Sequence, residues 1–329
     1  MKKLPNYAPL VMALLLAAAQ GCGRKPGTLP PGARLETYSF NVATSLEDRI
    51  IPVPAALLEY FRKEDKKPGY AAYVPTPEDK ALVVAYLRLL PPVYERILAE
   101  RCVGIYFIEG LIGNGVTSWV IGPGDEVYFY IVLNPAGLRD GLSVTLTERE
   151  RSCFVPRAGW DVLVDGGTKY KGLLYSLFHE ATHGLDYAEG ISPYTDDTMP
   201  HAYWPERGIS DDFFFNTWND YSKPREGAGF PGRDRITFYG LGGGPKLDIT
   251  EAPALYKGLG GSGFASLYGA RTWAEDLAEL ATFDVLTRKL GQPYLIFIQT
   301  PAGVSPLEPM RGTAGVRAAE VMEYLEEIK

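Results

Sequence analysis

The chain has 329 residues, which is room for one large domain or two modest ones, and its 46% hydrophobic and 22% charged residues are typical of a globular protein. Its 36 glycines and 26 prolines follow no period, which excludes collagen-like and solenoid repeats and indicates many turns. There are 33 basic residues against 40 acidic ones, and the net charge of −7 argues against nucleic acid as a partner.

The N-terminus has the pattern of a secretory signal. A basic start is followed by the apolar run 10–19, which is too short to span a bilayer and is typical of a signal peptide. The run ends in Ala19-Gln20-Gly21-Cys22, which resembles the lipobox of bacterial lipoproteins, where the cysteine becomes the lipidated N-terminus. Residues 1–21 are therefore predicted to be a lipoprotein signal peptide, and the resemblance implies a bacterial cell-envelope protein anchored to a membrane by lipid on Cys22. Ordinary secretory cleavage is the alternative.

Two further cysteines, Cys102 and Cys153, remain in the predicted mature chain. Because secreted proteins fold in an oxidising compartment, an even pair of cysteines favours a disulfide. The alternative is two buried free thiols, which behave as small apolar side chains.

The organisation after the signal is predicted to be simple. Residues 22–40 are expected to be a tether to the lipid anchor, because the stretch 23–35 is rich in proline and glycine and lacks periodicity. No convincing linker follows residue 40. Residues 41–329 are therefore interpreted as a single catalytic domain with two lobes.

Two helices are expected before the first strands. Residues 76–79 (Thr-Pro-Glu-Asp) supply a capping side chain, a proline at the first helical position and acids in the first turn. This pattern predicts a helix that ends before Pro91-Pro92. A second helix is predicted from Val93 to about Arg101.

Strand signals begin at residue 102. β-Branched and aromatic residues separated by glycine-containing turns predict strands over 102–108, 117–121 and 126–133, with another near 151–155. Because residues 127–133 are apolar at every position, we expect this strand to be covered on both faces.

The second half of the chain is predicted to be mainly helical outside one long insertion. Helices are expected over 169–187, 272–289 and 314–328, with a strand over 294–299. Residues 188–265 are aromatic and glycine-rich with weak periodicity, so they are interpreted as a functional loop system.

The strongest chemical signal lies in the helix expected over 169–187. Two of the three histidines in the chain occur there as His179-Glu180-Ala181-Thr182-His183. Residues i and i+4 share one face of a helix, so both imidazoles can bind a single Zn²⁺. Glu180 can then take a proton from a zinc-bound water. A helix with two unrelated surface histidines is the alternative, but apolar neighbours bury this helix.

A catalytic zinc also needs a third protein ligand, and three residues compete for that role. His201 is the only other histidine, but it lies in a proline-flanked loop. Glu189 stands where metzincins place their third histidine, yet Asp186 replaces the glycine that those enzymes need to turn the chain. Glu275 lies one helical turn from Glu279, so Glu275 can bind zinc while Glu279 accepts the Nδ1–H of a ligating histidine.

The segments His179–Asp186 and Tyr268–Glu279 together resemble the gluzincins of the anthrax lethal factor type. The resemblance implies an α+β, zincin-like fold: a small mixed sheet, a helix that carries the HExxH motif and a mainly helical C-terminal lobe. The zinc ligands that it implies are His179, His183 and Glu275.

The resemblance also assigns roles to three other positions. It implies that Glu180 is the general base and that Tyr268, seven residues before the ligand Glu275, stabilises the transition state. Asp186 belongs to the same pattern, and we interpret it as a buried acid near the helix end rather than as a ligand.

The predicted function is a membrane-tethered zinc endopeptidase that binds one Zn²⁺ per chain and cleaves a protein or peptide. A strand of the sheet over 102–133 could pair with an extended substrate. Aromatic side chains of the insertion could shape substrate pockets or simply form its core; they are Phe213, Phe214, Phe215, Trp218, Tyr221, Phe238 and Tyr239. The alternative is a catalytically inactive zincin-fold envelope lipoprotein that acts as a binding scaffold.

Overall fold

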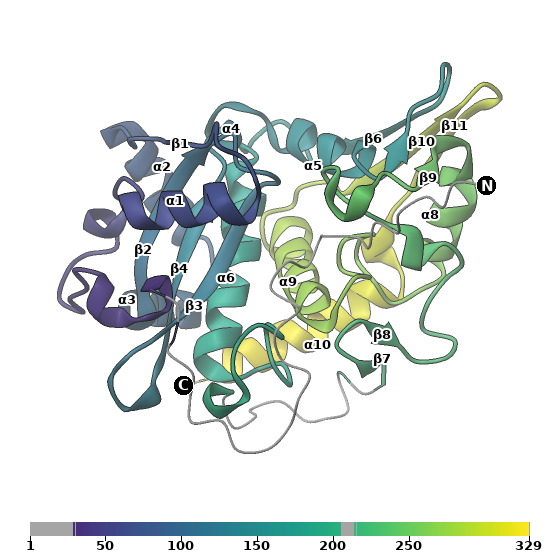
Figure 1. Ribbon diagram of the computed structural model, residues 1–329. Helices are drawn as coiled ribbons and strands as arrows, with labels where there is room; N and C mark the ends of the chain where they lie inside the picture. The colour runs from purple at the N-terminus through teal and green to yellow at the C-terminus, as the bar shows by residue number, and fades with distance from the viewer. Residues whose placement is uncertain (1–28, 30, 205–213, 215, 329) are drawn as a thin grey trace, which may run out of the picture.

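The computed structural model describes residues 29, 31–204, 214 and 216–328, and it shows a mixed α+β protein with small sheets (Figure 1). The predicted signal peptide, Cys22 and most of the predicted tether lie outside the described residues. Among the described helices, none is both long and apolar enough to cross a membrane.

The largest sheet has four strands in the order β1-β2-β4-β3. β2 and β4 are parallel, whereas β3 pairs antiparallel with β4 from Gly115 opposite Leu133 to Ile121 opposite Val127. β3 is therefore an edge strand. The bounds are β1 (Ala71–Ala72), β2 (Cys102–Glu109), β3 (Gly115–Ile121) and β4 (Val127–Leu133). The three strands predicted between residues 102 and 133 are confirmed.

Helices cover both faces of this sheet. α1 (Ala55–Glu64) lies over one face, where Phe61 packs in a cluster with Tyr130 and Val132 of β4. On the other face, Phe129 and Ile131 of β4 join the main core cluster with α2, α3 and α6. The alternation along β4 confirms that this apolar strand is covered on both sides. The bounds are α2 (Pro77–Leu87), α3 (Pro92–Arg101) and α6 (Leu173–Glu189).

The predicted start of α2 is confirmed, whereas α6 begins later than predicted. α2 begins as expected, because the Thr76 hydroxyl accepts a hydrogen bond from the Asp79 amide at 3.2 Å and the Asp79 carboxylate accepts from the Thr76 amide at 2.9 Å. α6 starts four residues later than predicted, since Lys171 forms an isolated bridge with Gly141. α6 ends at Glu189 and is capped by Gly190, whose φ of 62° is the left-handed conformation typical of glycine.

The C-terminal half combines helices with a second sheet. α9 and α6 lie side by side in the middle of the molecule, and α10 runs beneath them in Figure 1. An antiparallel sheet in the order β11-β10-β6 lies at the far end. The bounds are α9 (Trp273–Asp284), a π-helical turn (Val285–Lys289), α10 (Thr313–Glu327), β6 (Asp161–Asp165), β10 (Leu295–Thr300) and β11 (Gly303–Leu307).

Several elements escaped prediction. The expected strand over 151–155 is reduced to β5 (Phe154–Val155), because α5 (Leu142–Arg151) occupies the residues before it. The other elements not predicted are α1, α4 (Ala136–Arg139), β1, β6 and β11.

The insertion 188–265 contains more structure than a loop system. Its regular elements are β7 (Trp218–Asp220), β8 (Lys223–Pro224), β9 (Leu247–Asp248) and α8 (Ala252–Gly260). Phe214, Trp218 and Phe238 are buried in the main core, so for them the interpretation as core residues is correct. Phe213 and Phe215 lie outside the described residues.

The predicted disulfide is wrong, because Cys102 and Cys153 are both free and buried. Cys102 begins β2, where its thiol donates to the carbonyl oxygen of Gly104 at 3.5 Å. Cys153 follows α5, and its thiol lies 3.9 Å from the carbonyl oxygen of Arg149. Burial raises the pKa of the Cys102 thiol to about 12. Both side chains act as small apolar groups of the core.

The predicted tether is also too long. Ala33 is buried, and Arg34 bridges to Ile121 at the end of β3. The Tyr38 hydroxyl donates to the carbonyl oxygen of Gly32 at 2.7 Å. Ala33, Leu35, Tyr38 and Phe40 therefore pack on the folded body, so this part of the predicted tether belongs to the domain.

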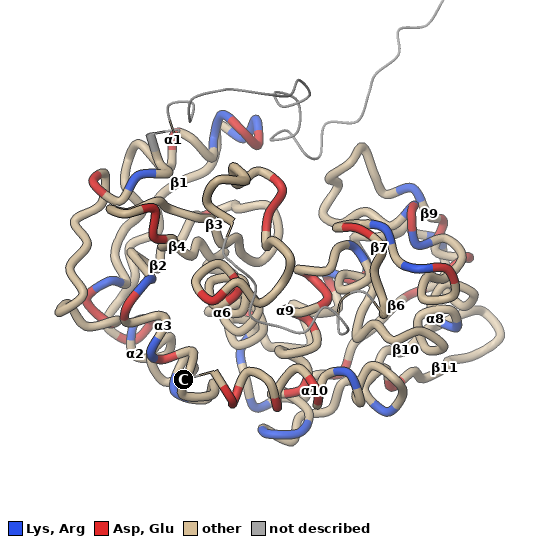
Figure 2. Tube along the Cα trace, turned by 90° about the horizontal axis from the view of Figure 1, so that it is seen from below, with Lys and Arg blue, Asp and Glu red and all other residues tan. Residues whose placement is uncertain are grey.

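Charged residues are spread over the outer elements. In Figure 2, basic and acidic segments are interspersed around the periphery, and acidic residues of α6 and α9 lie in the middle of the view. The two central helices thus bring carboxylates together in the interior, where they need partners.

Candidate metal centre

α6 can carry the site because it packs tightly against β4. A Cβ atom added at Gly184 would lie 2.3 Å from the ring of Phe129, so a side chain there would push the helix off the sheet. This close approach directs His179 and His183 toward α9, while Glu180 on the neighbouring face contacts β3. All three are buried or nearly so.

α9 supplies the third member of the site. Thr272 caps this helix by accepting a hydrogen bond from the Glu275 amide at 3.2 Å, which places Glu275 in the first turn. Glu279 lies one turn further on the same face, and both carboxylates reach the histidines of α6.

Three potential ligand atoms converge between the two helices. Nε2 of His179 lies 3.1 Å from Nε2 of His183 and 2.9 Å from Oε2 of Glu275, and Nε2 of His183 lies 3.4 Å from the same oxygen. In a tetrahedral centre with bonds of about 2.0–2.1 Å, ligand atoms are about 3.3 Å apart. Oε2 of Glu275 is buried and accepts no hydrogen bond of good geometry from the described residues. The three residues could therefore hold a metal ion.

The charges within the site are strongly coupled. Burial opposes protonation of His179, but the carboxylates of Glu275 and Glu279 outweigh it and raise the pKa of His179 to about 10. Burial raises the pKa of Glu275, but the two histidines outweigh this effect and hold it well below its usual range. The carboxylate is thus kept ionised, as a metal ligand must be.

Glu180 lies beside the three converging atoms and faces β3. The Thr117 hydroxyl lies 2.8 Å from Oε2 of Glu180 and 2.9 Å from its carbonyl oxygen. A Cβ added at Gly115 would lie 2.7 Å from Cγ of Glu180, so the carboxylate occupies space that only glycine leaves free. Burial raises the pKa of Glu180, which suits a group that must both accept and release a proton.

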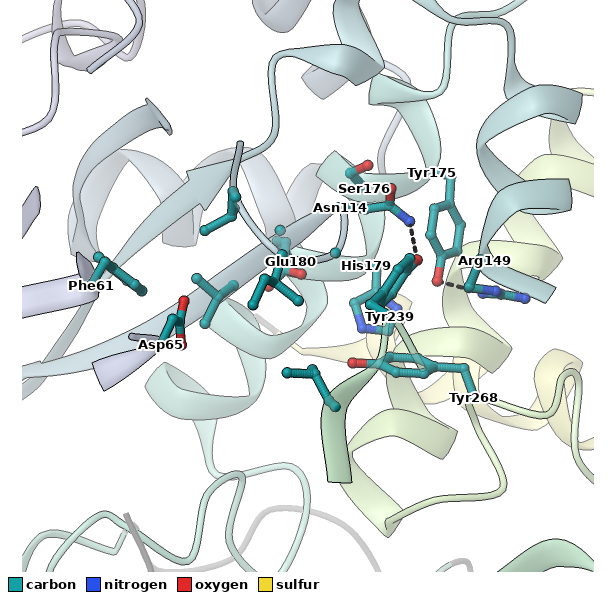
Figure 3. A pocket seen from close by; sticks show the side chains of 16 residues that line it. Phe61, Asp65, Asn114, Arg149, Tyr175, Ser176, His179, Glu180, Tyr239 and Tyr268 are labelled. Atoms are coloured by element: carbon teal, nitrogen blue, oxygen red, sulfur yellow. Dashed lines mark hydrogen bonds between the residues drawn. The ribbon is translucent and has the colours of Figure 1, made fainter. Parts of the chain in front are cut away.

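Tyr268 stands on the opposite side of the site. Its ring lies 5.5 Å from the ring of His179 and is held by an edge-to-face contact with Phe238 at 4.9 Å. Figure 3 shows its hydroxyl pointing into the cavity that His179 and Glu180 also line. Burial raises the pKa of Tyr268 far above its ordinary value, so the phenol stays protonated and can donate a hydrogen bond.

Two cavities meet at the site and share its central residues. The larger, of about 230 Å³, has a mainly apolar wall formed by Phe61, Leu111, Ile112, Val116 and Leu241. The smaller, of about 170 Å³, is more polar and is lined by Thr117, Thr195, Asp196, Tyr221 and Glu275, among others. Gly115 and Val116 line both cavities, so the start of the edge strand β3 lies where the two cavities meet.

The remaining candidates have clear positions. Oε1 of Glu279 faces Nδ1 of His179 at 2.9 Å, as the sequence suggested. Asp186 accepts hydrogen bonds from the amide and the hydroxyl of Ser192, each at 2.6 Å, and is not a member of the ligand group. Glu189 instead pairs with Arg96 at 3.0 Å, and His201 stacks on Trp204.

Some residues of the site carried no usable sequence signal. Gly115 and Thr117 were visible only as a turn and a strand residue, and nothing in the chain indicated their contact with Glu180. Tyr239 lines the larger cavity, accepts a hydrogen bond from Asn114 at 2.8 Å and has a φ of 55°. It was one of several aromatic residues in the insertion, without a distinguishing pattern.

Comparisons of the chain with protein-family models, with curated proteins and with solved structures found no match. The resemblance to gluzincins therefore remains a prediction from sequence motifs.

Proposed function

We propose that the protein is a zinc-dependent endopeptidase of zincin-like fold. The observation that carries this proposal is the convergence of two imidazole nitrogens and one carboxylate oxygen beside the buried Glu180. Two histidines and a glutamate are the protein ligands of catalytic zinc sites that keep a fourth position open. The mutual distances of about 3 Å between the three atoms fit such a centre.

The surrounding residues support peptide hydrolysis. A zinc ion held here would polarise a substrate carbonyl and lower the pKa of a water molecule. Glu180 would accept the proton of the attacking water and deliver it to the leaving nitrogen. The protonated hydroxyl of Tyr268 would donate a hydrogen bond to the oxygen that becomes negative.

The cleft has features that suit an extended peptide. The outer edge of β3 at Gly115–Thr117, away from the bridge between Arg34 and Ile121, offers backbone groups for pairing with a substrate strand, the mode in which peptides add to an exposed sheet edge. The mainly apolar cavity beside Glu180 is smaller than the ~300 Å³ at the low end for small-molecule ligands. It is suited to one bulky apolar side chain of the substrate.

The proposed location is the bacterial cell envelope, with a lipid anchor on Cys22. The support is the N-terminal sequence alone: a basic start, the apolar run 10–19 and the lipobox-like 19–22. The folded body would then lie close to the membrane surface, because it begins near residue 31.

The test combines metal analysis with cleavage profiling. Purified protein that begins at residue 23 should contain one zinc per chain and cleave peptides in a proteome-derived library. Glu180→Gln should keep the zinc and the fold but lose hydrolysis by at least ~10²–10⁴-fold, since the amide cannot accept the proton. Zinc-loaded wild-type protein that cleaves nothing would favour the alternative, an inactive binding scaffold. Equal hydrolysis by both proteins would show that Glu180 is not the base.

A further inference from the structure

Glu279 is held by four donors in the interior behind His179. Its Oε1 accepts from Nδ1 of His179 at 2.9 Å and from the Tyr175 hydroxyl at 2.7 Å. Its Oε2 accepts from Nη1 of Arg149 at 2.8 Å and from the Ser266 hydroxyl. A carboxylate has about four lone-pair positions, so every acceptor position of Glu279 is used. The carboxylate therefore cannot rotate without breaking a buried hydrogen bond.

Arg149 is fixed from its other side by a second carboxylate. Its Nε and Nη2 donate to Oε1 of Glu150 at 3.0 and 2.8 Å, and the Tyr256 hydroxyl donates to Oε2 of Glu150. Arg149, Glu150 and Glu279 are 1%, 0% and 0% exposed as side chains. Charges buried this deeply need such complete pairing. Glu279, Arg149, Glu150 and Tyr256 thus form one buried hydrogen-bonded array. Glu279 at one end contacts His179, whereas Tyr256 at the other end does not.

Ser266 links the same carboxylate to the segment that carries Tyr268. Its hydroxyl donates to Glu279 and accepts from the amide of Gly269 at 2.9 Å. A Cβ added at Gly269 would lie 3.1 Å from Cβ of Glu279, so this backbone rests directly on the glutamate. Glu279 thus contacts both the His179 imidazole and the backbone beside Tyr268.

We propose that Tyr175, Ser266 and Arg149 are positioning residues of the metal centre, which act on His179 through Glu279. Because an ionised carboxylate only accepts hydrogen bonds, a fixed Glu279 requires the hydrogen at Nδ1 of His179. When a metal ion displaces the proton of Nε2, the lone pair of this nitrogen faces the position where the ligand atoms converge. Loosening Glu279 frees the imidazole to rotate, and metal affinity falls. The inference rests on the proposed zinc site but needs no peptidase activity.

The experiment measures zinc affinity by competition with a chromophoric chelator. Tyr175→Phe removes only the hydroxyl that bridges Arg149 and Glu279. Tyr256→Phe is the matched control, because it removes the hydroxyl of an equally buried tyrosine at the far end of the array. We expect Tyr175→Phe to weaken zinc binding about tenfold, in line with residues that orient metal ligands. We expect Tyr256→Phe to bind zinc as the wild type does, with a similar change in Tm.

Ser266→Ala gives a second, independent measurement with little change in volume. It should also weaken zinc binding, because Oε2 of Glu279 loses a donor. Equal zinc affinity of Tyr175→Phe, Ser266→Ala and Tyr256→Phe would overturn the inference while leaving the zinc site in place. A wild-type protein that binds no zinc would instead overturn the proposed function, and this inference with it. The first failure appears in the variants and the second in the wild-type protein, so the two can be distinguished.

Discussion

The proposed chemistry depends on the identity of a few side chains that the fold brings within bonding distance. Glu275 decides the kind of site, because it is the only candidate third ligand whose oxygen approaches both histidines. Glu189 and His201 have other partners in the described structure, an arginine and a tryptophan. The contacts between α6 and α9 therefore decide among the three candidate third ligands that the sequence left open.

Replacement of the proposed ligand gives the first prediction. Glu275→Ala should lose zinc and activity together, because it removes a charged ligand. Glu189→Ala, which breaks only a partly exposed ion pair with Arg96, is the control and should keep full zinc occupancy. Zinc content after dialysis measures both. Loss of zinc from Glu189→Ala but not from Glu275→Ala would point to a metzincin-like site.

Tyr268→Phe gives the second prediction. It should retain zinc and lower kcat by ~10²–10³, because it deletes one donor to the developing negative charge. The ring contacts with His179 and Phe238 are kept, so the fold should be unaffected. Steady-state kinetics together with zinc analysis measure the effect. An unchanged kcat would exclude Tyr268 from the reaction.

The elements that matter most are α6 and the edge strand β3, which meet at Glu180. α6 can approach the sheet because Gly184 leaves room for Phe129, and β3 can approach α6 because Gly115 leaves room for Glu180. Both glycines have backbone conformations open to any residue, so their role is space rather than flexibility. The position of the proposed base is thus set by packing between two elements.

Gly115→Ala tests this packing. The added methyl group would overlap the Glu180 side chain and displace it, and a displacement of about 1 Å can reduce a catalytic rate ~10²-fold. Zinc content should not change, since neither histidine is touched. Gly69→Ala, where nothing lies within 4 Å of the new Cβ, is the control and should behave as the wild type. Equal rates for the two variants would contradict the packing argument.

At the level of the whole molecule, one continuous core cluster joins the face of the main sheet to α6, α9 and α10. The most deeply buried charges in this core are paired, as in Arg149 with Glu279 and Arg317 with Asp276. The buried carboxylate of Asp284, at the end of α9, is less well paired than these. Its Oδ1 lies 3.3 Å from Nη1 of Arg288 without a hydrogen bond of good geometry.

Asp284 predicts a pH dependence of stability. Burial, with a smaller contribution from Glu326, outweighs the effect of Arg288 and raises the pKa of Asp284 to about 6. The folded state therefore holds the proton more tightly than the unfolded chain, and stability falls as the pH rises from about 4 to above 6. Asp284→Asn should increase the free energy of unfolding by about 1–2 kcal/mol at pH 8, since solvent screens part of the charge, and hardly at pH 4. Urea denaturation at both pH values measures this, and an equal effect at both would refute it.

The core also sets the state of the two cysteines. In protein that begins at residue 23, Cys102 and Cys153 should resist alkylation while folded, because both thiols are buried. Both should react once the protein is unfolded, without any reductant. Mass spectrometry of alkylated samples distinguishes the outcomes. Recovery of a linked pair from oxidised protein would restore the disulfide that the sequence suggested.

The sequence by itself determined the features that repeat within one element. The spacing of His179 and His183, and that of Glu275 and Glu279, follows from the helix period, because residues four apart share a face. The cap at Thr76 and the strands over 102–133 also depend on neighbours in the chain. Such patterns span only a few residues, so they can be recognised in the sequence without knowledge of the tertiary structure.

Only the tertiary structure decided what these elements meet. It placed α9 against α6 across about a hundred residues of chain, put Gly115 and Thr117 on Glu180, and enclosed Glu279 with Arg149 from α5. It also buried Phe214, Trp218 and Phe238 of the insertion in the main core and left Cys102 and Cys153 as buried free thiols. The physical reason is that contacts between distant segments depend on the packing of whole faces, and a local pattern of residues does not record which face it will meet.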